Sequence, residues 1–343
     1  MNINMLETNI CRLLNIEYPI IQAPMNWISG ADLVAAVSKA GGMGTLGPNA
    51  GQKTPCNDEK EVAERLRGQI NKVRSLTDKP FAVNIAVASG DAKKFSDAFV
   101  RTVIDENVPV AIVTMGGPQV YTRELKNAGV KVIQTISTVR HGKRAEAEGV
   151  DAVVAGGYES GGHLGIEDQT TLCLVPQVVD AVHIPVIAAG GITDARGLVA
   201  VLALGAQAAY MGTRFLATYE SDAHPNVKEA VLKAKDSDLV VLCKNRGVGM
   251  SRVLKNDWSN KFYEKEIAGA SLEELLALME SHVMTKPGYL VSRMYVTFCL
   301  GDVVQGSVSV SGAVGSISEL MSAGDVVEQM MSQAKSLLKK LNK

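Results

Sequence analysis

The segment with the clearest chemical potential is a glycine-rich loop that carries a single histidine. It covers residues 156–165, Gly-Gly-Tyr-Glu-Ser-Gly-Gly-His-Leu-Gly, so five of its ten residues are glycine. Glycine lets backbone amides approach a ligand closely, and an imidazole can take or give a proton near neutral pH. We therefore predict that His163 is an acid–base group beside a bound ligand. The alternative is a purely structural histidine, against which the flanking glycines argue.

Two further glycine turns follow short apolar segments. They are Ala189-Gly190-Gly191-Ile192 and Met211-Gly212-Thr213-Arg214. Backbone N–H groups in such turns, together with a following helix N-terminus, form a cradle for phosphate. The two turns together predict a phosphorylated ligand or cofactor.

Polar residues also follow other apolar segments. Asn26 ends the turn that begins at Gln22, and Thr135 follows Gln134 near Ser137. Asn84 stands inside an apolar segment, where a buried amide needs a hydrogen-bond partner. Either the nearby backbone or a ligand can supply that partner, and the sequence leaves both open.

Short apolar runs that alternate with amphipathic helical stretches must position these groups. Helices that end at glycine and lead directly into the next run are typical of βα units in a parallel sheet. Eight such runs predict a (β/α)8 TIM barrel, whose functional loops follow the carboxyl ends of the strands. The predicted strands are Pro19–Gln22, Gly44–Leu46, Phe81–Ile85, Ala111–Thr114, Lys131–Ile136, Ala152–Ala155, Pro185–Ala189 and Ala208–Met211.

An open doubly wound sheet is the alternative architecture, since residues 42–47 fit the pattern GxGxxG. A dinucleotide site needs a strand before these glycines and a helix after them. Here a predicted helix precedes them and Pro48 follows, so we expect a helix cap and a buried strand.

The pattern changes after Met211. We expect a helix over 226–235 that follows the eighth strand, then helices and loops over 240–312, including a helix over 271–282 with a Ser271/Glu274 capping box. A last helix is expected over 326–341. The predicted division is a TIM barrel over 1–235, a helical lid or insert over 236–315, and a C-terminal helix over 316–343 that packs back on the barrel.

Composition limits the function classes. The chain has 343 residues and a formal net charge of −1, which argues against a nucleic-acid binder. Its five cysteines are scattered, as expected for reduced thiols, and no metal-ligand spacing is present. The first twenty residues lack an apolar core for a signal peptide, and the longest apolar run is too short for a membrane span. We expect a cytoplasmic protein that binds neither membrane nor nucleic acid.

Four ordered motifs identify a resemblance to the nitronate monooxygenase family, formerly called 2-nitropropane dioxygenases, which includes the FabK-type FMN-dependent enoyl-ACP reductases. The motifs are Tyr18–Met25, Glu159–His163, Ala188–Ile192 and Met211–Phe215. The resemblance implies FMN in the barrel mouth and His163 as the catalytic residue. The cofactor-binding residues that it implies are Pro24, Met25, Asn26, Asn84, Ala86, Thr135, Gly156, Gly161, Gly162, Ala189, Gly190, Gly191, Gly212 and Thr213.

The resemblance leaves the reaction open. Nitronate oxidation with O2, giving a carbonyl compound and nitrite, is the leading expectation, because Gln22-Ala23-Pro24-Met25 is similar to nitronate monooxygenases. Enoyl-thioester reduction with NAD(P)H is the second, because residues 159–163 and 221–226 are closer to the reductases. Residues 310–312, Val-Ser-Gly, depart from the reductases' Ala-Gly-Gln.

Other functions are weaker. NAD(P)H:quinone reduction is a third flavin reaction that the resemblance allows. A flavin-free isomerase or aldolase barrel would need a lysine or paired carboxylates at the strand ends, and no predicted strand end carries a lysine. A binding-only protein is the remaining class. The resemblance also suggests a homodimer.

Overall fold

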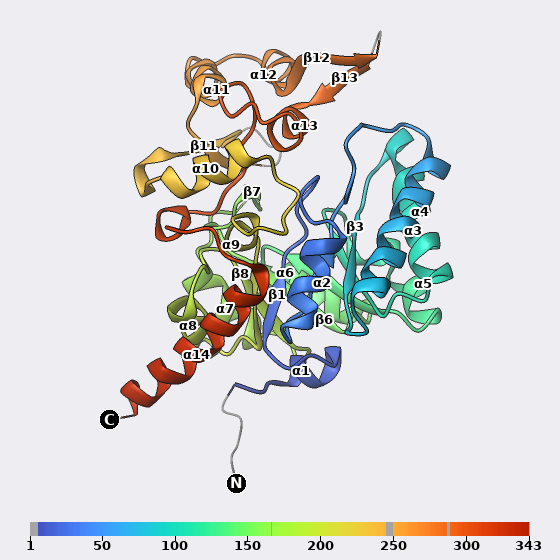
Figure 1. Ribbon diagram of the computed structural model, residues 1–343, viewed down its shortest axis with the longest axis vertical. Helices are drawn as coiled ribbons and strands as arrows, with labels where there is room; N and C mark the ends of the chain where they lie inside the picture. The colour runs from blue at the N-terminus through green and yellow to red at the C-terminus, as the bar shows by residue number, and fades with distance from the viewer. Residues whose placement is uncertain (1–5, 166, 245–249, 287–288, 343) are drawn as a thin grey trace.

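Eight parallel strands form the centre of the molecule (Figure 1). The computed structural model describes residues 6–165, 167–244, 250–286 and 289–342. The strands follow chain order around the sheet, and a parallel bridge between Ile21 and Met43 brings the two edges together. The predicted TIM-like barrel is thereby confirmed. Its strands are β1 (Ile20–Gln22), β2 (Thr45–Leu46), β3 (Ala82–Ala86), β4 (Val110–Thr114), β5 (Lys131–Ile136), β6 (Ala152–Gly156), β8 (Val186–Ala189) and β9 (Ala208–Met211).

Side chains along each strand alternate between two buried clusters. One cluster fills the barrel and includes Ile21 and Ile133, whereas Ile20 and Val132 belong to the cluster beneath the outer helices. This period of two is the pattern of strands that are covered on both faces. A short helix that sequence analysis did not predict, α1 (Asn9–Leu14), adds its apolar side chains to the barrel filling and lies at the amino end of the strands (Figure 1).

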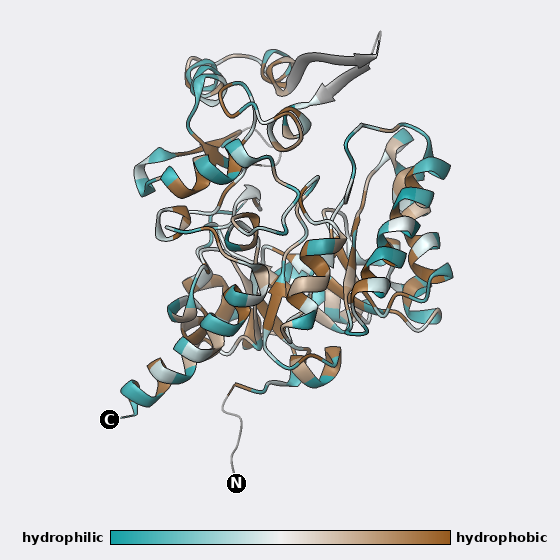
Figure 2. Ribbon diagram, in the orientation of Figure 1, coloured by the Kyte–Doolittle hydropathy of each residue, from teal (hydrophilic) through white to brown (hydrophobic). Residues whose placement is uncertain are grey.

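Seven helices alternate with the strands, where sequence analysis expected amphipathic helical stretches. Figure 2 shows hydrophilic and hydrophobic residues alternating along α3 and α4, and in α3 the buried residues Leu66, Ile70 and Val73 form the inward face. Asp194 caps the last of the seven by accepting from the backbone N–H groups of Arg196 and Gly197. The helices are α2 (Ala31–Lys39), α3 (Glu59–Leu76), α4 (Lys93–Asp105), α5 (Thr122–Asn127), α6 (Val139–Ala147), α7 (Thr171–Val179) and α8 (Ala195–Ala203), with 3-10 turns η1 (Gly90–Ala92) and η2 (Pro118–Val120).

The helix that sequence analysis expected over 226–235 is confirmed as α10, but it does not cover the barrel wall. After β9 comes a single turn, α9 (Thr213–Leu216), and then α10 (Pro225–Lys233), whose buried Val227 and Val231 pack with Trp27 and Tyr295 away from the barrel wall. The final helix α14 (Ala323–Leu341) instead packs against α8 and α2, which flank β9. Its buried residues recur at helical spacing and join the cluster beneath the outer helices: Ala323, Val326, Val327, Met330, Met331 and Ala334.

Residues 236–315, here called the insert, lie over the carboxyl end of the barrel (Figure 1). Sequence analysis predicted helices and loops here, and the structure also has four strands. The helix expected over 271–282 ends at Met279, although its Ser271/Glu274 capping box is confirmed. The elements are η3 (Asp236–Asp238), β10 (Leu239–Leu242), β11 (Ser251–Leu254), α11 (Asp257–Ile267), α12 (Leu272–Met279), β12 (Glu280–Lys286), β13 (Tyr289–Ser292), α13 (Arg293–Phe298) and η4 (Val314–Ser316).

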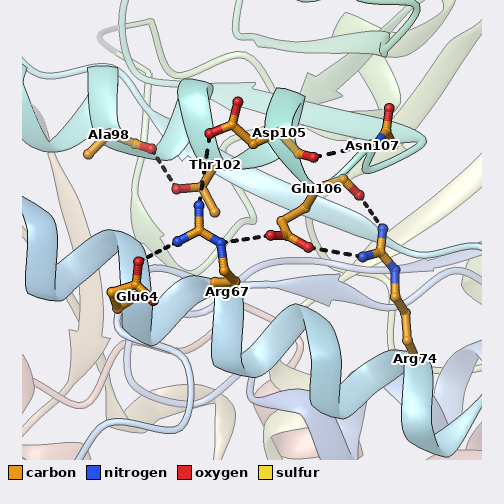
Figure 3. A network of polar contacts seen from close by, with 8 residues as sticks. All are labelled: Glu64, Arg67, Arg74, Ala98, Thr102, Asp105, Glu106 and Asn107. Carbon is orange, nitrogen blue, oxygen red and sulfur yellow. Dashed lines mark hydrogen bonds and ion pairs between the residues drawn. The ribbon is translucent and has the colours of Figure 1, made fainter.

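An ion-pair network on the outer surface joins α3 to the end of α4 (Figure 3). Glu106 accepts from Arg67 Nε at 2.7 Å and from Arg74 Nη1 at 3.2 Å, and Arg67 also pairs with Glu64. In the same region, the Thr102 hydroxyl donates a hydrogen bond to the Ala98 carbonyl.

Among the described helices, none combines the length and the apolar character that crossing a bilayer requires.

Candidate active site

The carboxyl ends of the barrel strands hold all the residues predicted to form the site. Pro24, Met25 and Asn26 follow β1, and Asn84 and Ala86 lie on β3. The other positions lie at or just after the ends of β5, β6, β8 and β9, with three (Gly161, Gly162 and His163) in the segment between β6 and α7: Thr135, Gly156, Gly161, Gly162, His163, Ala189, Gly190, Gly191, Gly212 and Thr213. The fold therefore brings the predicted residues to one end of the barrel, beneath the insert.

Small side chains line the inner wall at this end. Deeper in the barrel the inward positions, such as Ile112 and Val154, are fully buried. One step further along the same strands, Thr114 and Gly156 are only half-buried, and so are Ala86 on β3 and Thr135 on β5. Because the outermost inward side chains are small and reachable by solvent, the barrel end can accept a flat group against the ends of its strands.

Asn84 uses its amide within the protein. Its Nδ2 donates to the Ile112 carbonyl at 2.8 Å and to Thr114 Oγ1 at 3.0 Å. The sequence left open whether the protein or a ligand partners the Asn84 amide. In the structure, protein groups accept the hydrogen bonds that its amide nitrogen donates. On the neighbouring side, Asn26 Oδ1 accepts from Asn49 Nδ2 at 3.0 Å, which ties the loop after β1 to the loop after β2.

The turn after β8 presents unused backbone donors. Gly190 and Gly191 have φ values of +107° and +74°, conformations that favour glycine. The N–H groups of Gly191 and Ile192 make no hydrogen bond within the described part of the chain. Nearby, Thr213 Oγ1 accepts from the N–H of Ser311 at 2.9 Å, so a residue of the insert completes this corner. Free amides at the end of a strand are suited to an anion such as phosphate.

The strand-6 loop carries His163 into a small sheet that sequence analysis missed. Gly162 and His163 form β7, which pairs with β11 of the insert so that Ser251 lies opposite His163. The imidazole is accessible to solvent, yet the surrounding protein desolvates it and lowers its pKa from the ordinary value of 6.5. The lowered pKa of His163 favours the neutral, proton-accepting form of the imidazole near pH 7.

Glu159 and Thr171 support the same loop, and sequence analysis missed both. The Glu159 carboxylate accepts from the Thr171 N–H at 2.7 Å and from its hydroxyl at 2.9 Å. Thr171 Oγ1 also lies 3.2 Å from the Ala189 carbonyl and 3.0 Å from that of Gly190. This arrangement joins the loop after β6 to the turn after β8, a link between separate loops that the sequence pattern does not reveal.

Two buried hydroxyls point into the barrel without a partner. Tyr210 on β9 belongs to the barrel-filling cluster, and its hydroxyl oxygen has no hydrogen-bond partner among the described residues, as is also true of Thr45 Oγ1 on β2. Burial raises the pKa of the Tyr210 phenol, so the hydroxyl keeps its hydrogen. An unsatisfied buried hydroxyl calls for a partner that the protein does not supply. Strand alternation could have identified Tyr210, because Ala208 two residues earlier also faces inward.

The comparison with protein families decides the identity. The model of the nitronate monooxygenase family matches residues 7–99 and 95–333. The chain belongs to the nitronate monooxygenase family. It is therefore an oxidoreductase of this family, whose members are typically flavin-dependent.

Relatives of this nitronate monooxygenase family member carry several names. A Rhodococcus jostii protein named (3aS,4S,5R,7aS)-5-hydroxy-7a-methyl-1-oxo-octahydro-1H-indene-4-carboxyl-CoA dehydrogenase is 40% identical over 255 residues, 74% of this chain and 67% of the relative. A probable nitronate monooxygenase of Staphylococcus saprophyticus is 36% identical over 315 residues, 79% of this chain and 85% of the relative. The structure of FabK from Thermotoga maritima is 38% identical, covers 98% of both chains and has a TM-score of 0.85.

The described residues fit a flat cofactor that carries a phosphate. The small side chains at the strand ends leave room for a ring, and the free amides after β8 suit an anion. The unpartnered Tyr210 hydroxyl adds a buried donor on the inner wall. Within the described part of the chain, no group of three or more His, Cys, Asp or Glu side chains is arranged to hold a metal ion.

Proposed function

We propose that this protein is an FMN-dependent oxidoreductase that acts at the carboxyl end of the barrel beside His163. The observation that carries the proposal is the combination of small inward residues, free turn amides and an accessible, desolvated imidazole at one end of the barrel. Flavin binding is typical of the family, and phosphate-bearing cofactors bind at this end of the TIM barrel.

In this proposal the residues divide into three groups. Pro24, Met25, Asn26, Asn84 and Ala86 would lie against the isoalloxazine ring. Thr135, Gly156, Gly161, Gly162 and Ala189 would contact the ring and the ribityl chain. Gly190, Gly191, Gly212 and Thr213 would hold the phosphate through backbone N–H groups and the Thr213 hydroxyl. When bound, FMN supplies electron transfer between two substrates, which no side chain of the protein can provide.

We propose nitronate oxidation as the reaction, with O2 as the second substrate and a carbonyl compound and nitrite as products. The family model supports it, and so does the turn Gln22–Met25. Neutral His163 would take a proton from the carbon beside a nitro group, or hold the nitronate by a hydrogen bond. Its lowered pKa keeps the imidazole able to accept that proton near pH 7.

Enoyl-thioester reduction with NAD(P)H is the second candidate, and a specific observation favours it. Identity to FabK is 38%, whereas identity to the nitroalkane oxidase of Streptomyces ansochromogenes is 28%, over 95% of this chain and 99% of that one, with a TM-score of 0.75. The Rhodococcus relative is also named for a CoA thioester substrate.

Anaerobic spectra of the FMN-loaded protein separate the candidates. We expect an alkyl nitronate to bleach the flavin, O2 to restore the colour, and nitrite to accumulate during turnover, while NADH and NADPH bleach it slowly or not at all. Rapid bleaching by NADH or NADPH that crotonyl thioester reverses would instead establish thioester reduction, and reversal by quinone alone would establish quinone reduction. A protein that binds no FMN would contradict all three.

A further inference from the structure

Arg252 of the insert reaches down to the loop that carries His163. Its Nη2 donates to the Tyr158 carbonyl at 2.8 Å, and its Nε donates to the Ser160 carbonyl at 3.2 Å. The guanidinium carbon also lies 4.8 Å from the centre of the Tyr158 ring, within cation–π range. One side chain thus makes three contacts with residues that precede His163 by three and five positions.

The backbone around Arg252 holds the other side of the histidine. Arg252 lies opposite Gly162 in the β11–β7 pair, Ser251 lies opposite His163, and the Leu164 N–H donates to the Met250 carbonyl at 2.8 Å. The side chain therefore fixes residues 158–160, and its strand fixes residues 162–164. Between these two anchored stretches lies only Gly161.

The loop depends on such anchors because it is rich in glycine. Glycine has the largest conformational freedom of any residue, and Gly162 has a φ of +67°. Within the loop, the Glu159 carbonyl accepts from the Gly312 N–H at 2.8 Å, so the insert supplies partners for three successive carbonyls, those of Tyr158, Glu159 and Ser160. Arg252 satisfies two of these three with one planar fork.

We propose that Arg252 is a positioning residue that sets the orientation of His163 toward the reacting substrate. The inference rests on the proposed function, because it assumes that His163 acts in the reaction. The planar guanidinium can bind two carbonyls and stack on Tyr158 at the same time, whereas a lysine ammonium can do only one of these well. Neither the family motifs nor the pattern of the barrel strands includes this residue.

The variant Arg252→Lys tests the proposal, and Arg293→Lys is its matched control. Arg293 makes the same kinds of contact entirely within the insert: its Nε donates to the Leu278 carbonyl at 2.7 Å, its Nη1 to the Gln305 carbonyl at 2.6 Å, and its Cζ lies 5.2 Å from the Trp258 ring. Both variants keep the charge and lose the fork, but only Arg252→Lys alters the His163 loop.

We expect Arg252→Lys to lower kcat about 10- to 100-fold, the loss typical of a misplaced catalytic group, with KM and the FMN Kd changed by less than about threefold. Turnover is measured with the alkyl nitronate or crotonyl thioester that the spectra above identify. Hydrogen exchange provides a second readout that needs no substrate: amides of residues 158–164 should exchange faster in Arg252→Lys and at the wild-type rate in Arg293→Lys.

The His163→Ala variant separates failure of this inference from failure of the proposed function. If His163→Ala keeps full turnover, the proposed role of His163 is wrong. If His163→Ala loses turnover while Arg252→Lys keeps wild-type kcat and wild-type exchange in the loop, Arg252 does not position the histidine. Equal losses of kcat in Arg252→Lys and Arg293→Lys would also overturn the proposal, since they would reflect general loosening of the insert. The double variant His163→Ala/Arg252→Lys should lose no more kcat than His163→Ala alone.

Discussion

Gly161 offers a sharp test of how closely the insert packs on the strand-6 loop. A Cβ atom placed on Gly161 would lie 2.4 Å from the Val310 carbonyl carbon, 2.7 Å from the Ser311 nitrogen and 2.8 Å from the Val310 oxygen. All three are backbone atoms, so no side chain can rotate away. Ordinary contacts begin at 3.4 Å, so the backbone of residues 310 and 311 must withdraw by about 1 Å (3.4 − 2.4) in Gly161→Ala.

That withdrawal strains two hydrogen bonds. The Ser311 N–H donates to Thr213 Oγ1 at 2.9 Å, and the Gly312 N–H donates to the Glu159 carbonyl at 2.8 Å. Overpacking costs about 1–3 kcal/mol, and a weakened hydrogen bond costs about 0.5–1.5 kcal/mol. We therefore expect Gly161→Ala to lower the free energy of unfolding by about 2–6 kcal/mol.

Gly162→Ala is the matched control, because the added methyl group makes only ordinary van der Waals contacts. Its nearest neighbour is Ser309 Cβ at 3.6 Å, and the strain comes only from the φ of +67°. A left-handed alanine costs about 1–2 kcal/mol. Urea unfolding of both variants, analysed with the same m-value, measures the difference between their free energies of unfolding. A loss in Gly161→Ala smaller than that in Gly162→Ala would show that residues 310 and 311 do not pack on the loop as described.

Four other predictions concern three side chains, those of His163, Tyr210 and Glu106. Because desolvation lowers the pKa of His163, a reaction that needs the neutral imidazole should keep its rate at pH values below the ordinary pKa of 6.5, and the kcat/KM profile measures this. The same shift means that below pH 6.5 the unfolded chain binds more protons than the folded protein, so acidification destabilises the folded parent. His163→Asn lacks this titrating group, so acidification should lower the Tm of the variant less than that of the parent. Tyr210→Phe should leave the Tm of the cofactor-free protein unchanged or raise it, since it removes an unpaired buried hydroxyl; a marked fall would show that the hydroxyl has a partner. Glu106→Gln should lower stability by about 0.5–1.5 kcal/mol at low salt and less at 1 M salt, which denaturation at both salt concentrations measures, and a loss that salt leaves unchanged would contradict the ion-pair origin.

The barrel could be predicted because its signals are local. Each strand is a short apolar run, and β2, β5, β6 and β9 directly follow a helix that ends at glycine. Asp194 caps the start of α8 with its own side chain, which is also a local signal. Because functional groups of such barrels follow the strand ends, the sequence alone was enough to group the glycine turns with His163. The six-residue α1 was missed because so short a segment shows little periodicity.

The insert could not be predicted in the same way, because its pairings join distant segments. β7 has two residues and exists only through its pairing with β11, almost ninety residues later in the chain. The contacts of Arg252 with Tyr158 and Ser160 accompany that pairing, and the packing of residues 310 and 311 on Gly161 likewise joins segments far apart in the chain. Local propensity carries no information about such partners.

The position of α14 has a consequence for how the protein is made. The gap between α8 and α2 is covered by α14, so synthesis must reach residues near 334 before the apolar sides of these two helices are covered. Until then the apolar sides of α8 and α2 lack their cover, and a nascent chain without its C-terminus exposes them to aggregation or to chaperones. Deleting α14 (Ala323–Leu341) should therefore lower the yield of soluble protein, whereas shortening an ordinary flexible tail would leave it intact.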